Sequence, residues 1–214
     1  ANEPGNVLRS RLHTLQRLPA ITAEDPVVCA ETTEALKATI TVPTLRMNSM
    51  DLYVPFARND FDQAMDLIPA SVSEEWRAAR ETLGASEDPV DTTFAEWSLR
   101  RTGELHVAGA PIAAGTDTPI GWSIPGYSLH TELEQYVEIG MTPLEALYSA
   151  TVKPAEFFGL DTEMGQIKVG AIADAVLLNA NPLEDITATR SVEAVINRGV
   201  LLTRDQLNAL VTMK

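Results

Sequence analysis

The stretch Ala110-Pro111-Ile112-Ala113-Ala114-Gly115-Thr116-Asp117 is the most informative part of this chain. Residues 110–114 form a short apolar run of strand length, and residues 105–109 before them have the pattern of a helix that ends on a glycine. A buried strand after a helix is typical of α/β folds, in which chemistry lies at the carboxyl ends of parallel strands. Asp117 follows such a strand, where a carboxylate can hold a proton or a metal. The alternative interpretation of Asp117 is an N-cap or loop aspartate.

Upstream of this strand the sequence predicts helices around one further strand. Asp25-Pro26 is an N-cap followed by proline, and predicts a helix to about Lys37 with Val28, Thr32, Ala35 and Leu36 on one face. We expect a helix over 7–18, a buried strand over 40–45 and a long helical insertion over 48–104, with helices at 71–83 and 94–105. This insertion forms either a lid over the mouth of a barrel or a cover on its flank.

Downstream of Asp117 the period of the apolar pattern changes from helical to strand-like. Residues 125–139 predict a helix that ends at Gly140, and Thr142-Pro143-Leu144-Glu145 predicts the start of another that extends to about Gly159. We expect its buried face to contain Leu144, Leu147 and Tyr148. Further expected elements are strands at 166–169, 174–178, 192–197 and 200–203, a hairpin turn at 197–199 and a helix over 203–213.

In this order the motifs resemble the carboxyl-terminal part of the metal-dependent amidohydrolase superfamily, especially its imidazolonepropionase-like and Xaa-Pro-dipeptidase-like members. The resemblance extends from about Asp25 to Gly199 and is strongest between Leu105 and Leu183. It implies the carboxyl-terminal part of an α/β (β/α)8 TIM barrel, with 40–45 and 110–114 as the seventh and eighth strands. Residues 1–159 would be the partial barrel domain, and residues 160–214 would supply strands of a small β-sandwich domain.

The resemblance also implies one or two divalent metal ions, with zinc as the expected metal. The family holds these ions with a His-x-His pair, a lysine, two further histidines and the aspartate of a Gly-Thr-Asp motif. The three histidines of this chain, His13, His106 and His130, form no such pair. Asp117 alone carries over as a metal ligand and as the catalytic general acid and base. The resemblance implies hydrolysis of an amide, cyclic amide or dipeptide bond in a small-molecule or dipeptide substrate.

Four further residues could line the rim of the substrate pocket: Thr118, Trp122, Tyr127 and His130. His130 could bond back towards Asp117, but a helix histidine packed against the barrel is the favoured interpretation. A rival hypothesis is a serine hydrolase that uses Ser128, His130 and Asp117. It is disfavoured because residues two apart on a helix point about 200° apart, and because the sequence contains no Gly-x-Ser-x-Gly elbow.

Two parallel strands cannot close a barrel, and unpaired strand edges favour association with another chain. We therefore expect the sequence to be the carboxyl-terminal half of an amidohydrolase, from proteolysis, a split gene or a partial sequence, and inactive without the amino-terminal half. The alternative is a non-catalytic or assembly subunit that pairs through these edges with a separate histidine-bearing chain. A homo-oligomer that buries the edges is also compatible with the sequence.

Composition limits the function classes. The 214 residues are 45% hydrophobic and carry a net charge of −14, which argues against nucleic acid and anionic membranes as partners. The single cysteine, Cys29, excludes an internal disulfide, and we expect it on a buried helix face. Residues 1–6 have no signal-peptide character. The default expectation is a cytoplasmic protein, although a secreted parent could carry its signal on the missing half.

Overall fold

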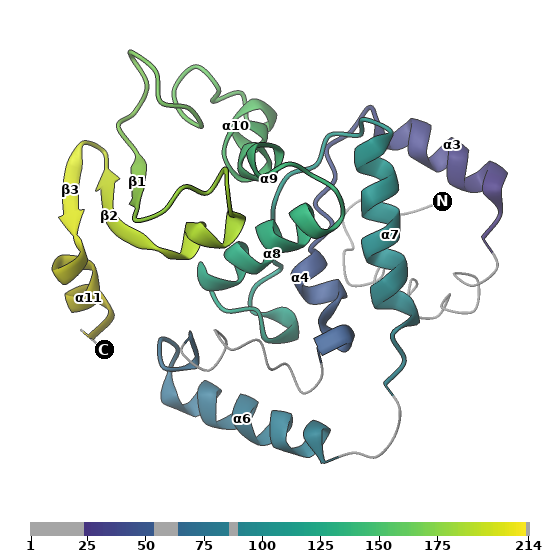
Figure 1. Ribbon diagram of the computed structural model, residues 1–214, viewed down its shortest axis with the longest axis horizontal. Helices are drawn as coiled ribbons and strands as arrows, with labels where there is room; N and C mark the ends of the chain where they lie inside the picture. Colours follow the sequence, from purple (N-terminus) through teal and green to yellow (C-terminus); the bar gives the residue numbers. More distant parts are fainter. Residues whose placement is uncertain (1–23, 54–63, 86–89, 213–214) are drawn as a thin grey trace.

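A computed structural model of the chain describes residues 24–53, 64–85 and 90–212, and the helix expected over 7–18 lies outside them (Figure 1). The described chain is mainly helical, with a small sheet on one side and α6 along one end (Figure 1). Its α-helices are α3 (Pro26–Leu36), α4 (Leu45–Asn48), α6 (Ala70–Gly84), α7 (Thr93–Val107), α8 (Tyr127–Glu138), α9 (Pro143–Ala150), α10 (Val152–Phe157) and α11 (Arg204–Thr212). The shorter elements are the 3-10 turns η1 (Met50–Tyr53), η2 (Ile120–Trp122) and η3 (Ile186–Arg190), and the strands β1 (Ala175–Leu178), β2 (Val192–Asn197) and β3 (Val200–Thr203).

Two helix starts follow the predicted capping signals. The Asp25 carboxylate accepts a hydrogen bond from the Val27 amide at 2.9 Å and so caps α3. At α9 the capping box is complete: the Glu145 amide donates to the Thr142 hydroxyl at 3.2 Å, and the Glu145 carboxylate accepts from the Thr142 amide at 2.7 Å. Both caps satisfy amide groups that have no partner inside the helix.

The main hydrophobic core surrounds α8. Tyr136 and Leu45 are fully buried, and Leu105 and Leu133 pack into the same cluster. Ile186 of η3 joins this cluster as well, so residues after 160 contribute to the core that α8 organises. The division of the chain into units 1–159 and 160–214 stays a prediction.

The segments expected as two parallel barrel strands lie side by side but pair over a single bridge, Thr41 with Ile112. The Thr41 amide donates to the Pro111 carbonyl at 2.9 Å, and the Ala113 amide donates to the Thr41 carbonyl at 2.9 Å. The parallel direction is as predicted, but the expected strand over 40–45 is too long, because Thr44 adopts a left-handed conformation (φ 49°) and Leu45 begins α4. Pro43 has no backbone N–H to donate to the neighbouring segment, which shortens the ladder further.

The sheet after residue 160 is antiparallel in the order β1-β2-β3. The expected hairpin at 197–199 joins β2 to β3, with Arg198 at φ 48° and Gly199 at φ 82°, as a two-residue turn of this type requires. The strand expected at 166–169 is wrong: Ile167 is 94% exposed, and residues 166–169, all of which are described, form an irregular segment. The seventh and eighth strand positions and the β-sandwich stay predictions.

Four expected helix faces or bounds are corrected. In α9 Leu144 is 51% and Tyr148 is 44% exposed, and the helix instead buries Ala146 and Ser149, small residues that let it approach α8 closely. The predicted helix to Gly159 is two helices, broken at Thr151. All residues of α3 are described and none is fully buried, so the predicted buried face there is wrong and Cys29 is only half-buried. Helix α6 extends from Ala70 to Gly84, one residue beyond the expected bounds 71–83 at each end.

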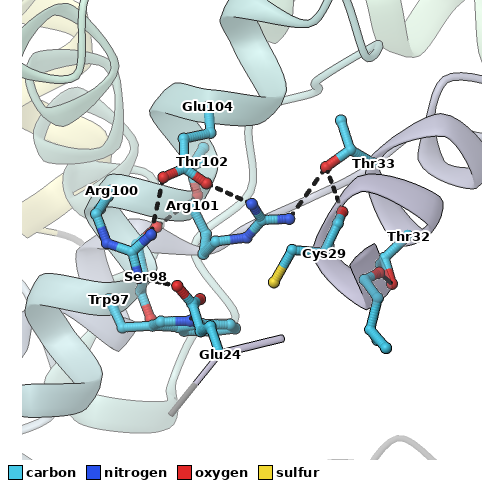
Figure 2. Close-up of polar contacts among 11 residues, drawn as sticks. Glu24, Cys29, Thr32, Thr33, Trp97, Ser98, Arg100, Arg101, Thr102 and Glu104 are labelled. Carbon is cyan, nitrogen blue, oxygen red and sulfur yellow. Dashed lines mark hydrogen bonds and ion pairs between the residues drawn. The ribbon is translucent and has the colours of Figure 1, made fainter. Parts of the chain in front are cut away.

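Polar side chains connect the amino-terminal part of the described chain to α7 (Figure 2). The Arg100 guanidinium lies between the carboxylates of Glu24, at 2.7 Å, and Glu104, at 2.8 Å. The Trp97 indole donates to Glu24 at 2.6 Å, and Arg101 donates to the Thr33 hydroxyl of α3 at 3.1 Å. Because these groups are partly solvent-exposed, each contact adds at most about 1 kcal/mol, and together they orient α3 on α7.

Candidate functional site

Asp117 lies in a loop over residues 115–123, called here the Asp117 loop, which directly follows the apolar segment 110–114. Asp117 is half-buried and left-handed (φ 56°), and its carbonyl accepts a hydrogen bond from the Ile120 amide at 2.9 Å. Such a backbone conformation costs a non-glycine residue about 1–2 kcal/mol, and it persists where surrounding contacts impose it. The loop therefore holds Asp117 in a definite orientation at the carboxyl end of the bridged segments.

Gly115 has a steric role at the start of this loop. A Cβ atom at this position would lie 2.5 Å from Cγ1 of Val42, a residue of the neighbouring bridged segment. That distance is shorter than real side chains tolerate, so a side chain at position 115 would force the Val42 side chain or one of the two segments to move. The next contact in the loop joins the hydroxyls of Thr116 and Thr118 at 2.8 Å.

Trp122, one of the predicted rim residues, closes the 3-10 turn at the far end of the loop. Its backbone is left-handed (φ 59°), and its carbonyl accepts a hydrogen bond from the Arg46 guanidinium at 3.0 Å. Its side chain packs against a second hydrophobic cluster formed by Ala64, Met65, Ile68 and Ile124. Thr118 and Trp122 therefore belong to the same short loop as Asp117.

The other two predicted rim residues, Tyr127 and His130, lie in the first turn of α8 beside η3. Their rings meet edge to face, with centroids 6.2 Å apart. The Arg190 guanidinium carbon lies 5.1 Å from the centre of the Tyr127 ring, and His130 Nδ1 lies 3.0 Å from the Thr189 hydroxyl oxygen. The interpretation of His130 as a packed helix histidine agrees with this contact.

Ser128, the serine of the rival hydrolase hypothesis, bonds through its side chain to the segment that leads into α8. It is 3% exposed, and its hydroxyl accepts a hydrogen bond from the Ile124 amide at 2.7 Å. A hydroxyl engaged in this way supports the turn that leads into the helix. A buried hydroxyl that supports a turn and a solvent-accessible nucleophile make opposite demands on one side chain.

The sequence prediction missed a buried carboxylate next to this region. Glu132 of α8 is fully buried, and its two oxygens accept hydrogen bonds from the amides of Leu45, at 2.9 Å, and Arg46, at 2.6 Å. Burial raises the pKa of Glu132 to about 7, against the lowering effects of these amides, of the Tyr136 hydroxyl and of the Arg46 charge. The available signal was the spacing, since Glu132 precedes Tyr136 by one helical turn and the two side chains therefore lie on the same face of α8.

The described residues do not make a metal site by themselves. In residues 24–53, 64–85 and 90–212, no three side chains of histidine, cysteine, aspartate or glutamate gather closely enough to hold an ion. One carboxylate such as that of Asp117 does not retain zinc without further ligands. The donor set of this part of the chain therefore does not fit a resident metal.

Within the same ranges, no helix has the length and hydropathy that a membrane span needs.

Comparison with known proteins identifies the relatives of this chain. The profile described as "Amidohydrolase family" matches residues 99–202. Ochratoxinase from Aspergillus niger is 42% identical over 90 residues, which are 41% of this chain and 18% of that protein. Its crystal structure superposes with a TM-score of 0.52 and 27% identity, over 81% of this chain and 34% of the other.

Two further relatives agree with this assignment. Imidazolonepropionase from Symbiobacterium thermophilum is 35% identical over 72 residues, 33% of this chain and 17% of that protein. A crystal structure of an Xaa-Pro dipeptidase with bound methionine in the active site has a TM-score of 0.57 at 24% identity, over 85% of this chain and 38% of the other, and shows a shared fold. The matched regions span less than a fifth of the two curated relatives. On these matches, the chain belongs to the amidohydrolase superfamily.

Proposed function

We propose that this chain is the carboxyl-terminal part of a metal-dependent amidohydrolase that hydrolyses a carbon–nitrogen bond in an amide, cyclic amide or dipeptide. Membership of the superfamily supports the reaction class, and the relatives named ochratoxinase, imidazolonepropionase and Xaa-Pro dipeptidase support a hydrolase. The proposed substrate class is taken from the names of these relatives and from the sequence motifs.

The observation that carries the proposal is the position of Asp117. Its carboxylate follows the segment that pairs in parallel with Thr41, within the family match over residues 99–202. In α/β proteins the carboxyl ends of parallel strands are where catalytic groups collect. We assign Asp117 the roles of metal ligand and of general base and acid, and we assign Thr118, Trp122, Tyr127 and His130 to the rim of the pocket.

The remaining metal ligands come, in this proposal, from polypeptide outside the 214 residues. Support comes from the ligand count: the sequence has three histidines, none in a His-x-His pair, and the described residues contain no group of metal-binding side chains. The 214-residue chain is therefore expected to be inactive alone. Its partner is an amino-terminal segment of the same protein.

The test is hydrolysis by the protein encoded by the complete reading frame, measured with a panel of N-acyl amino acids, cyclic amides and dipeptides. Asp117→Asn keeps the size of the side chain but removes its basicity, and should lower kcat/KM by about 10²–10⁴-fold. The matched control is Asp161→Asn, which makes the same change at an exposed residue distant in sequence from the loop and should retain wild-type activity. Full activity in Asp117→Asn, or turnover by the 214-residue chain alone, would refute the assignment.

A second candidate is an assembly subunit without catalytic activity, which pairs with a histidine-bearing chain. Strands β1 and β3 form the two ends of the sheet, and Val176, Leu177, Val200 and Leu201 on them are each more than half exposed. Apolar side chains on exposed edge strands favour pairing with another strand. Co-purification with a histidine-bearing chain and no turnover by the resulting complex would favour this alternative, and light scattering would distinguish it from a homodimer.

A further inference from the structure

The carboxylate of Glu132 reaches from α8 to a part of the chain 86 residues away. Its Oε1 accepts from the Leu45 amide and its Oε2 accepts from the Arg46 amide, so both oxygens are used on the first turn of α4. Helix α4 has only four residues, and Thr44 before it provides no side-chain cap. A helix this short is not stable through its own hydrogen bonds, and therefore needs an external acceptor for its first amides.

Helix α4 in turn contacts the loop that carries Asp117. Arg46 is 9% exposed, and its guanidinium donates to the Trp122 carbonyl at 3.0 Å. The loop has left-handed backbone at both Asp117 and Trp122. Two such residues separated by only five positions require contacts that impose the conformation. The Arg46 bond supplies one of these contacts at the end of the loop distant from Asp117.

The next turn of α8 holds the segment that leads into the loop. The Tyr136 hydroxyl donates to the Ala113 carbonyl at 3.0 Å, in the apolar segment that leads into Asp117. Gln135 of the same helix bonds to Ser49, which follows α4. Helix α8 thus contacts the segment before Asp117 directly and the segment after it through α4.

We infer that Glu132 is a positioning residue, which orients the Asp117 loop by holding the first turn of α4 and, through Arg46, the Trp122 carbonyl. The contribution of Glu132 to catalysis rests on the proposed function, because it requires Asp117 to act in the reaction. The structural link between Glu132 and the loop does not depend on that function. It can be measured in the chain without any substrate.

The experiment is fluorine NMR of the chain labelled with fluorotryptophan. Each of Trp76, Trp97 and Trp122 is assigned by its own substitution to phenylalanine. Glu132→Gln replaces one acceptor oxygen by an amide donor, and should shift or broaden the Trp122 signal. The Trp97 signal, from α7, should stay in place. The matched control is Glu145→Gln, which makes the same change in the cap of α9 and should leave Trp122 unaffected.

A second variant keeps the inference testable if Glu132→Gln does not fold. Arg46→Met leaves the Glu132 cap on α4 in place and removes the donor to Trp122, so it should shift the Trp122 signal while circular dichroism stays at the wild-type level. A Trp122 signal unchanged in a folded Glu132→Gln, or unchanged in Arg46→Met, overturns the inference. The two claims can fail separately. A shifted Trp122 signal supports the positioning link, whereas full activity in Asp117→Asn refutes the proposed function without affecting that link.

Discussion

Replacing Glu132 with glutamine should change how the stability of this chain depends on pH. Burial raises the pKa of Glu132 from its ordinary 4.5 to about 7, so between these values the folded chain binds a proton that the unfolded chain has released. Stability from this group is therefore fully present below pH 4.5 and is lost as the pH rises through 7. Glutamine does not titrate, and the variant should lack this loss.

The size of the effect follows from the two pKa values. Each pH unit of difference corresponds to about 1.36 kcal/mol, which gives a maximum of about 3 kcal/mol, and most of this falls between pH 5 and pH 8. The variant also leaves an amide of Leu45 or Arg46 without its acceptor, which costs about 1–3 kcal/mol at both pH values and cancels in the comparison.

Urea unfolding of both proteins at pH 5 and pH 8 measures the difference. From pH 5 to pH 8 the wild-type chain should lose about 2–3 kcal/mol more stability than Glu132→Gln. Glu145→Gln is the control: the amide and hydroxyl of Thr142 lower the Glu145 pKa, so its contribution is lost only as the pH falls below the tested range. Parallel pH dependence in wild type and Glu132→Gln would refute a proton bound to buried Glu132.

Two further substitutions test the local structure. Gly115→Ala places a Cβ 2.5 Å from the Val42 side chain and should lower the free energy of unfolding in urea by about 1–3 kcal/mol. The double variant that adds Val42→Ala should recover part of this stability. Equal stability of Gly115→Ala and wild type would contradict the close approach. Thr142→Ala removes the hydroxyl that caps α9 and should cost about 1 kcal/mol, seen as a lower midpoint in the same assay. Thr151→Ala, at the C-cap of α9, removes a hydroxyl that bonds to the Leu147 carbonyl and should cost less.

Local signals in the sequence predicted local structure well. The cap at Asp25, the capping box at Thr142 and the turn at Arg198-Gly199 each depend on a few neighbouring residues, and the structure confirms all three. These features could be predicted because their hydrogen bonds or backbone angles involve residues no more than four positions apart.

Features that depend on distant partners were predicted poorly. Leu144 was expected to be buried because it is large and apolar, yet α9 approaches α8 through the small residues Ala146 and Ser149. Residues 166–169 have the alternation of a strand, but a strand needs a neighbour to pair with, and Ile167 and Val169 are exposed. The role of Glu132 was missed because its partners lie 86 and 87 residues away in the sequence.

The most direct test of the account is anomalous diffraction from crystals of the complete protein grown with zinc. We predict an anomalous peak about 2.0–2.2 Å from a carboxylate oxygen of Asp117, with the other ligands supplied by polypeptide outside these 214 residues. Crystals of Asp117→Asn should show no peak at this position. An ion bound without Asp117, or an Asp117 carboxylate directed away from every bound ion, would contradict it.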